Sequence, residues 1–492
     1  MYDTEKDLQL KDFNSDLERS TMVGMFGRVA YNYKQKYFLS VTLRRDASSK
    51  FGENTRWGTF PSYAIAYTFS EEPYMDWARD FLDFGKIRLS YGKSGKQFEY
   101  PYFAFGVLIV NNIPFHGNQT ITPYWPNGLI NPKLSWEETK QFDAGLDLEF
   151  FGNRLSLELD YYYRYTDKLL AQVTLPGDYN AYTAQWQNAY AISNQGIELQ
   201  IKADLIRSEK LHWDFSFNIA RNWNRFEKSN NGMDFTNLAS KHNLNIIGKP
   251  LNGIYVYNDE GYYNSQDEVP LYYVNGRRKY LSSLGNQIYS PGDRRIQDVD
   301  GNGQVATMVP LLEDRVYGGS PLPLAFGGIA STLKWKGIDV NLLFSYKLGR
   351  HVLNAGRGAS VGTILRANTA EMMVPILADL DKVSFWQKPG DNTDFPINEL
   401  ENGKNNFATN LKSNVEKINY LKLKSISIGY ILPVFPKQSK HYARVFMSVE
   451  NVFTITNSSS PDPESIDIVT GVDSNNNYPL ATRFTLGLTL NL

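Results

Sequence analysis

The chain has 492 residues, which is enough for several soluble domains or for one large β-structure. Its 51 Lys and Arg nearly balance its 52 Asp and Glu, so the charge gives no support to nucleic-acid binding. Cysteine is absent, which excludes disulfides, thiolate zinc sites and a cysteine nucleophile.

Hydrophobic residues make up 42% of the chain, but they are dispersed among polar ones. No apolar run reaches the roughly 18 residues that a membrane-spanning helix needs. The first segment, MYDTEKDLQLKDFNSDLERS, is polar and shows no signal-peptide pattern. We therefore expect a soluble protein, a protein that crosses a membrane as strands, or a chain that lacks its true N-terminus.

Apolar and polar residues alternate with a period of two, which is typical of β-strands. The clearest example is a pair of segments, 141–150 and 155–164, joined by the turn FGNR at 151–154. One face of each segment is polar or charged. The other face consists of Phe142, Ala144, Leu146, Leu148, Phe150, Leu155, Leu157, Leu159, Tyr161 and Tyr163.

The same pattern recurs along the chain, mostly in pairs joined by short turns. In chain order the segments are 22–33 with 37–46, 60–69 with 84–92, 141–150 with 155–164, 196–205 with 211–223, 324–335 with 338–349, 420–430 with 442–453, and a last segment at 482–492. The sequence therefore predicts about 13 antiparallel strands.

Long connections alternate with the short turns, and they cover residues 96–135, 166–194, 224–321, 349–419 and 454–481. Such lengths are uncommon in compact soluble domains, whereas outer-membrane barrels combine short periplasmic turns with long extracellular loops. The apolar face would then contact lipid, and the polar face would line the lumen. Aromatic residues at both ends of the 141–164 pair, about 25 Å apart, match two aromatic girdles.

The number of strands also predicts how much of a barrel is present. With the long loops outside, the first strand and the last strand both run inward, so an odd antiparallel set cannot close with every neighbour antiparallel. We expect residues 1–21 to end an extracellular loop and residues 22–492 to form the C-terminal part of a larger transmembrane antiparallel barrel. A soluble sandwich with aromatic core strands is the alternative.

The chain resembles the barrel region of the SusC/RagA-like TonB-dependent transporters of Bacteroidota outer membranes. The stretches that carry this resemblance run in family order and include FGRVAYNYKQKYFLSVTLRRDASSKFGENTRWGTFPSYAIAYTFSEEPYM, LSWEETKQFDAGLDLEFFGNRLSLELDYYYRYTDKLL, PGDRRIQDVDGNG, YLKLKSISIGYILP and YPLATRFTLGLTLNL. One departure is the last residue, Leu492, where family members often have Phe.

The resemblance implies a 22-stranded barrel closed by an N-terminal plug, of which this chain would lack the plug, the TonB box and the first strands. It implies a location in the outer membrane and contact with its lipid. It also implies a SusD-like surface lipoprotein as partner and energy from the TonB-ExbB-ExbD complex acting on the missing plug. The imported ligands would be oligosaccharides or, in some members, peptides.

Residues 290–305, SPGDRRIQDVDGNGQV, contain the start of a calcium-loop pattern. Positions 1, 3 and 5 of this pattern are Asp298, Asp300 and Asn302. Position 12 is Val309 instead of the bidentate Glu, so an EF-hand is not predicted. Two interpretations stay open: a structural Ca²⁺ site completed by a later oxygen, from Glu313 or Asp314, or a tight Asx turn in an external loop. No cofactor is otherwise required.

No catalytic motif is present, so the chain is not expected to be an enzyme. The five His residues are isolated, and neither HExxH nor G-x-S-x-G occurs. Sugars are bound by aromatic faces together with planar polar groups. Four aromatic residues in the long connections are candidate ligand contacts, although each could instead pack within its loop or on a partner: Tyr124, Trp125, Trp186 and Trp386.

The sequence therefore predicts nutrient import through the outer membrane, of oligosaccharides or peptides, together with a SusD-like lipoprotein. One alternative is a soluble or surface-exposed β-rich glycan-binding protein without transport activity. Another is a calcium-dependent enzyme, for which turnover would be abolished by a chelator. The identity of the imported nutrient is not predicted.

Overall fold

The computed structural model describes residues 19–100, 104, 109–115, 118–124, 129–175, 184–230, 235–236, 242–274, 276–283, 286–305, 314–356, 384–397, 409–433, 442–474 and 478–491. Nearly all regular structure in these residues is β-strand, and the helical elements are short 3-10 turns. None of the described helices is long and apolar enough to cross a bilayer. The predicted all-β fold is confirmed.

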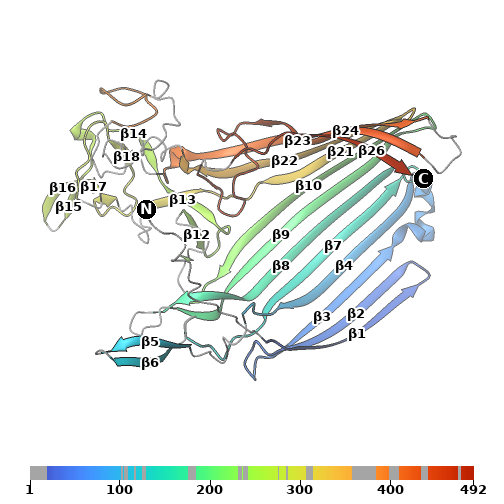
Figure 1. Cartoon of the computed structure of the whole chain (residues 1–492), viewed down its shortest axis with the longest axis horizontal. Coiled ribbons are helices and arrows are strands. Elements are labelled where there is room, and N and C mark those ends of the chain that lie inside the picture. Colours follow the sequence, from blue (N-terminus) through green and yellow to red (C-terminus); the bar gives the residue numbers. More distant parts are fainter. Residues whose placement is uncertain are drawn as a thin grey trace, which may run out of the picture. The chain divides into compact units, whose positions relative to one another are not determined.

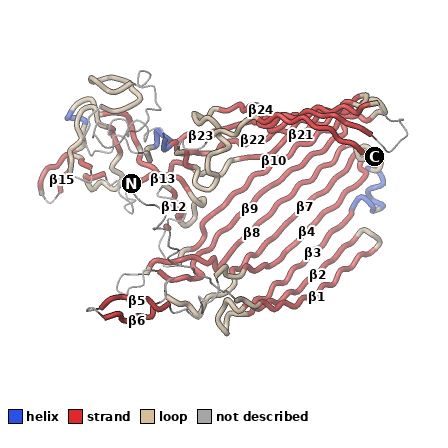
Figure 2. Tube along the Cα trace, viewed as in Figure 1, coloured by secondary structure: helices blue, strands red, loops and turns tan. Residues whose placement is uncertain are grey.

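One sheet dominates the structure (Figures 1 and 2). Its hydrogen-bonded order is β1 (Met22–Tyr33), β2 (Tyr37–Ser48), β3 (Trp57–Thr68), β4 (Leu82–Lys96), β7 (Glu137–Phe150), β8 (Leu155–Thr174), β9 (Ala184–Arg207), β10 (Leu211–Lys228), β21 (Ala325–Trp335), β22 (Ile338–Asn354), β23 (Val415–Leu432), β24 (Tyr442–Thr456) and β26 (Arg483–Asn491). β25 (Val472–Asp473) adds a short parallel pairing to β22. The strands on this path follow the chain order and agree in number with the sequence prediction.

The chain forms two compact units. Unit 1 comprises Met1–Tyr67, Arg88–Asp143 and Arg164–Ile192, and unit 2 comprises Thr68–Ile87, Ala144–Tyr163 and Ser193–Leu492. Unit 1 has a core of aromatic and aliphatic side chains: Phe51, Phe60, Phe98, Leu134 and Trp136. Unit 2 contains the C-terminal strands β10 and β21–β26 and the long connection that precedes β21.

The register of the strands gives the sheet two chemically different faces. In unit 2, one row of paired residues is apolar: Leu211, Trp335, Ile338, Tyr430, Val445 and Leu488. The adjacent row, one residue along each strand, is His212, Lys334, Asp339, Gly429, Phe446 and Gly487. Successive residues of a strand point to opposite faces, so the two rows lie on opposite sides of the sheet.

The apolar face is exposed instead of being covered by protein. Leu486, in the middle of β26, is 83% exposed, and Phe484 on the same face is 69% exposed. In water, each such side chain would forgo about 1.5–3 kcal/mol of burial free energy. Contact with lipid removes this cost, as in the outward-facing band of a transmembrane barrel.

The turn between β1 and β2 shows why the hairpins are tight. Lys34 and Gln35 both have positive φ, 54° and 57°, and the backbone N–H of Lys36 donates to the Tyr33 carbonyl at 3.0 Å. This is the arrangement of a type I′ turn, whose twist matches that of the strands. Beside it, four rings lie in successive contact, with centroids 5.0 to 6.5 Å apart: Tyr31, Tyr33, Tyr37 and Tyr67.

The connection 224–321 contains short strands that the sequence pattern did not predict. They are β11 (Phe235–Thr236), β12 (Asn243–Ile246), β13 (Gly253–Tyr257), β14 (Asp259–Tyr262), β15 (Leu271–Val274), β16 (Arg277–Tyr280), β17 (Ser282–Ser283), β18 (Arg294–Ile296), β19 (Gln304–Val305) and β20 (Arg315–Gly319). With residues 384–397 and 409–414 they form what we call the loop module. Strands of two to five residues are too short to show an alternating pattern. A similar small hairpin, β5 (Ile109–Phe115) with β6 (Asn118–Tyr124), lies in the connection 96–135.

The loop module has its own hydrophobic core, which makes it a folded unit of structure instead of an irregular loop. The core residues are Tyr257, Tyr263, Val269, Leu281, Tyr289, Ile296, Val305 and Leu411. Burial raises the pKa of the Tyr263 hydroxyl to about 12, so this group stays neutral at physiological pH. The core fixes the surfaces that the module presents.

Candidate functional site

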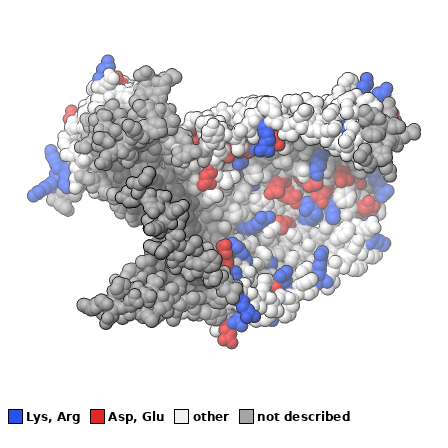
Figure 3. Space-filling model, viewed as in Figure 1, with Lys and Arg blue, Asp and Glu red and all other residues white. Residues whose placement is uncertain are grey.

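The polar face of the sheet carries charged side chains held in pairs, and Figure 3 shows acidic and basic groups lying together over the sheet. In unit 2, Arg444 donates two hydrogen bonds to Asp339, from Nε to Oδ1 at 2.8 Å and from Nη2 to Oδ2 at 2.5 Å. In unit 1, Glu138 pairs with Lys93 at 2.6 Å and with Lys168 at 2.8 Å. Such a surface suits a water-filled lumen and would be costly in contact with lipid.

Gly429 makes room for the ion pair between Asp339 and Arg444. It lies opposite Asp339 in the ladder, and a Cβ at this position would overlap the Arg444 guanidinium and the Asp339 carboxylate. Arg444 also lies over the ring of Phe446, 5.1 Å from its centroid. The missing side chain therefore lets the ion pair lie flat across β23.

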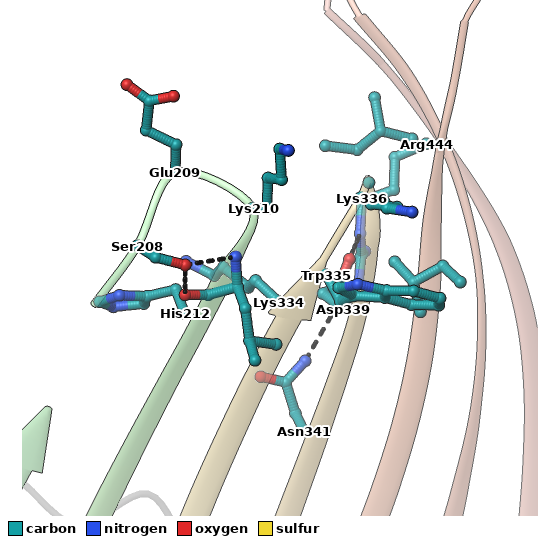
Figure 4. Close-up of a pocket in the computed structure, with 14 residues that line it drawn as sticks. Ser208, Glu209, Lys210, His212, Lys334, Trp335, Lys336, Asp339, Asn341 and Arg444 are labelled. Carbon is teal, nitrogen blue, oxygen red and sulfur yellow. Dashed lines mark hydrogen bonds and ion pairs between the residues drawn. The ribbon is translucent and has the colours of Figure 1, made fainter. Parts of the chain in front are cut away.

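A cavity of about 590 Å³ lies at the short-turn end of unit 2 (Figure 4). The turns from β9 to β10 and from β21 to β22 line it, and its basic residues include Lys210, Lys334, Lys336 and Arg444. Ser208 holds the first turn, because its hydroxyl donates to the Leu211 carbonyl at 3.0 Å and accepts from the Leu211 N–H at 3.1 Å. On β22, the Asn341 side-chain amide donates to the Asp339 carboxylate at 3.2 Å.

His212 is not isolated in the structure, in contrast to its position in the sequence. A carboxylate oxygen of Asp204, a ring nitrogen of His212 and a carboxylate oxygen of Asp214 lie within 4.8 Å of one another. His212 Nε2 is 2.9 Å from Asp214 Oδ1. The three residues come from β9 and β10 on either side of one turn. His212 forms no pair at the helical spacing of a metal motif such as HExxH, but it lies two residues from Asp214 on one face of β10.

The segment 457–474, which we call the strap, is fixed to β22 by a buried arginine. Arg350 is 1% exposed, and its Nε donates to the Pro321 carbonyl at 2.9 Å. Its two terminal nitrogens donate to the carbonyls of Ile466 and Asp467. A buried guanidinium is stable only when its donors are satisfied, so these carbonyls determine where the strap can lie.

Ion pairs fix the middle of the strap. Lys422 of β23, whose side chain is 3% exposed, lies 3.1 Å from Asp462 and 3.0 Å from Glu464. Lys424 lies 2.8 Å from Glu464. Burial by itself would raise the pKa of Asp462, but the Glu464 N–H and the Lys422 ammonium together hold that pKa below its ordinary value. The pKa of Glu464 is likewise lowered, against burial, by hydrogen bonds from both lysines.

The structure brings together the predicted calcium-loop carboxylates. Oxygen atoms of Asp298, Asp300 and Asp314 lie within 4.8 Å of one another, and Asp314 is fully buried. The same groups hold a tight turn: Asp298 accepts from the N–H groups of Gly301 and Gly303, both at 2.8 Å. Asp314 accepts from the Val299 N–H at 2.9 Å.

Asn302 takes part in the same turn. It donates to Asp300 at 2.7 Å and accepts from the Gln304 N–H at 2.7 Å. These bonds are those of Asx turns, the second of the two interpretations of the sequence. Glu313 lies outside the described residues, and a structural calcium ion stays a prediction.

The four aromatic candidates do not form one group. Trp186 packs in the core of unit 1, 5.0 Å from Phe98 and 5.9 Å from Tyr100. Trp386 belongs to the loop module and is 6% exposed, which leaves little of its ring accessible to a sugar. Tyr124 ends β6, where its backbone pairs with Ile109, and Trp125 lies outside the described residues. Their role in ligand binding stays a prediction.

Comparisons with known proteins agree with this geometry. The sequence model of the family "TonB dependent receptor-like, beta-barrel" matches residues 2–355. TonB-dependent receptor P3 of Formosa agariphila is 30% identical over 505 residues, which cover 97% of this chain and 46% of the relative. TonB-dependent receptor SusC of Bacteroides thetaiotaomicron is 27% identical over 504 residues, which cover 98% and 45%. The chain spans about half the length of the curated relatives it matches.

A solved structure shows the same fold. A chain of the RagAB peptide transporter superposes with a TM-score of 0.71 at 23% identity, over 99% of this chain and 50% of that chain. The two-faced sheet, the alternation of short turns with long connections and the family match over most of the sequence lead to one conclusion. The chain belongs to the TonB-dependent receptor-like β-barrel family of the outer membrane, and its resemblance to SusC and RagA is confirmed.

Proposed function

We propose that this chain is the C-terminal barrel part of a SusC-like transporter that imports oligosaccharides or peptides across the outer membrane. Uptake is driven by the TonB-ExbB-ExbD complex acting on a plug domain, and a SusD-like surface lipoprotein delivers the ligand. The proposal rests on family membership, and on relatives whose names include SusC and the RagAB peptide transporter.

The two faces of the sheet are compatible with transport. The polar face carries paired charges and a folded loop module follows at the long-connection end, while the apolar face is left to lipid. A lumen through which a hydrated ligand passes needs a polar inner face of this kind.

Deletion and complementation test the proposal. In the native host, we expect in-frame deletion of the complete gene to abolish growth on at least one oligosaccharide or peptide mixture, and the wild-type gene to restore it. A tagged full-length protein should co-purify with a surface lipoprotein in detergent. Normal uptake of every nutrient by the deletion strain would contradict the proposal.

The alternative of a soluble or surface glycan-binding protein makes a different physical prediction. A lipid-facing sheet requires detergent for solubility and gives heat-modifiable mobility on gels, because the folded barrel resists detergent until it is heated. A protein that stays monodisperse in plain buffer would favour the alternative.

A further inference from the structure

A cavity of about 540 Å³ lies in the loop module, and it is distinct from the carboxylate turn and from the aromatic candidates. Its walls come from three parts of the sequence: β14 with the residues after it, β18, and the segments 390–395 and 413–414. The volume is within the range of small-ligand sites, about 300–1,000 Å³. We call this cavity the polar pocket.

The floor of the polar pocket is a buried ion pair. Arg294 Nη1 lies 2.9 Å from Asp259 Oδ2, with side-chain exposures of 8% and 2%. The other oxygen of Asp259 accepts from the Ser413 N–H at 2.9 Å. Arg294 also covers the ring of Tyr262, 5.5 Å from its centroid. The floor is therefore electrostatically satisfied before any ligand binds.

The wall of the pocket is held in place by backbone hydrogen bonds. Tyr262 donates from its hydroxyl to the Thr393 carbonyl at 3.2 Å, and burial raises its pKa, which keeps this donor protonated. Asn264 accepts from the Gly390 N–H at 2.7 Å. These bonds tie the 390–395 segment to β14, so the pocket is preorganised and a ligand need not order it.

The rim presents polar groups that the described part of the chain does not use. Arg295 and Asn392 are exposed, and neither side chain makes a hydrogen bond to another described residue. Glu260, also on the rim, accepts one bond from the Asn258 amide at 3.2 Å and keeps its other oxygen. A guanidinium, an amide and a carboxylate thus offer both donors and acceptors within one cavity.

The lining limits the class of ligand. Among the described lining residues, Phe395 has the one purely apolar side chain, and it is buried. Most small-ligand pockets are largely apolar, so this one has little to offer an apolar peptide side chain or a lipid. Carboxylates, from Asp259, Glu260, Asp391 and Asp394, outnumber the guanidinium groups of Arg294 and Arg295. This balance disfavours an anion.

We propose that the polar pocket binds one or two sugar rings of a neutral oligosaccharide, and that Arg295 and Asn392 hydrogen-bond its hydroxyl groups. A hydroxyl both donates and accepts, which matches the mixed rim, and a neutral sugar meets no repulsion from the carboxylates. This inference rests on the proposed import function and selects its oligosaccharide branch over its peptide branch.

Calorimetric titration of the detergent-purified full-length protein tests the inference. The probes are neutral linear hexasaccharides of glucose, mannose, xylose and galactose, an acidic hexagalacturonide and a mixture of hexapeptides. We expect at least one neutral hexasaccharide to bind, and Arg295→Ala and Asn392→Ala each to weaken that binding about tenfold. The control is Arg277→Ala, an exposed arginine of the same module that does not line the pocket.

The outcomes separate the pocket from the import function. Equal binding by Arg295→Ala, Asn392→Ala and wild type would overturn the pocket inference, as would binding of the peptides or of the acidic probe alone, or binding of no probe. If the two variants still restore growth of the deletion strain with full saccharide affinity, import stands and the pocket inference fails. If the wild type binds a neutral hexasaccharide at the pocket but the deletion strain imports normally, the import proposal fails and the pocket inference stands.

Discussion

The main sheet and the loop module are both made of β-strands, but they place apolar residues in opposite ways. In the sheet, Leu486 and Phe484 point outward and stay exposed. In the module, Tyr257 and Tyr289 are fully buried in a local core. The sheet therefore depends on lipid for its stability, whereas the module depends on contacts within the chain. Single substitutions and changes of pH or calcium can test the two sides of this difference separately.

The largest effect is expected from a charge on the lipid-facing side of the sheet. Leu486→Arg places a guanidinium in the middle of β26 and should lower the unfolding free energy in lipid vesicles by about 2–4 kcal/mol. Thr485→Arg is the matched control, because its neighbour in the ladder is Ser448 on the polar face. Urea titration followed by heat-modifiable mobility measures both. Equal losses in the two variants would contradict the assignment of faces.

Loss of the strap anchor should be the next largest effect. Arg350→Leu removes the guanidinium that donates to the buried Pro321 and Ile466 carbonyls and leaves the Asp467 carbonyl with the Gly471 N–H, which should destabilise the strap by on the order of 2–3 kcal/mol. Hydrogen exchange of residues 457–474 measures the effect. The exposed Arg277→Leu is the control, and unchanged protection of the strap in Arg350→Leu would show that the anchor is dispensable.

A methyl group beneath the ion pair between Asp339 and Arg444 should lower the unfolding free energy by less. Gly429→Ala forces Arg444 away from Asp339 and is expected to lower the unfolding free energy by about 1–2 kcal/mol. Gly27→Ala is the matched control, because a Cβ at that strand position meets no atom within 4 Å. If both alanine variants are equally stable, the room left by Gly429 is not needed.

Acid should release the strap while the core of the module stays folded. The pKa values of Asp462 and Glu464 are lowered from 3.8 and 4.5, so their ionised forms add stability that is present above those ordinary values and is lost as the pH falls through the lowered values. We expect proteolysis of 457–474 by pepsin to increase below about pH 4. The double variant Asp462→Asn, Glu464→Gln should show the increased cleavage without this pH dependence.

The smallest effect concerns the carboxylate turn. If calcium completes the site of Asp298, Asp300 and Asp314, titration of chelator-treated protein with CaCl₂ will show binding that Asp300→Asn removes. We expect removal of calcium to affect the protection of residues 298–304, because Val305 and the other core residues of the module are held by their own packing. Absence of binding in the wild type would leave the turn held by its own hydrogen bonds.

Strand pattern and hairpin pairing could be predicted because lipid and water impose a period of two on the sequence. The row of Leu211, Trp335 and Ile338 belongs to segments whose alternation is visible in the sequence alone. The loop module was not predicted in detail, because its strands are short and its core residues, such as Tyr257 and Leu411, come from distant positions. No local sequence pattern indicates such long-range contacts.

The candidate sites, too, can be predicted only where their residues are close together in the sequence. The sequence predicts that Asp298, Asp300 and Asn302 share one loop, as a calcium site or as an Asx turn, because they are neighbours in the chain, and Asp314 follows as a nearby oxygen. The polar pocket joins β14 to a segment more than a hundred residues later, so its members share no spacing. The group around His212 does have a local signal, because His212 and Asp214 are two residues apart and lie on one face of β10.

The strap has a consequence for the order of folding during biogenesis. Asn243, in the first part of the loop module, donates to the carbonyls of Asn252 and Thr470, and the second of these lies 227 residues away. Leu353 similarly donates to the carbonyl of Gly471 at 2.8 Å. Contacts of such sequence separation form late, because the intervening chain must first be confined. The module therefore reaches its final packing only after residues 470 and 471 have joined it, so a chain truncated before residue 470 should carry an incompletely protected loop module.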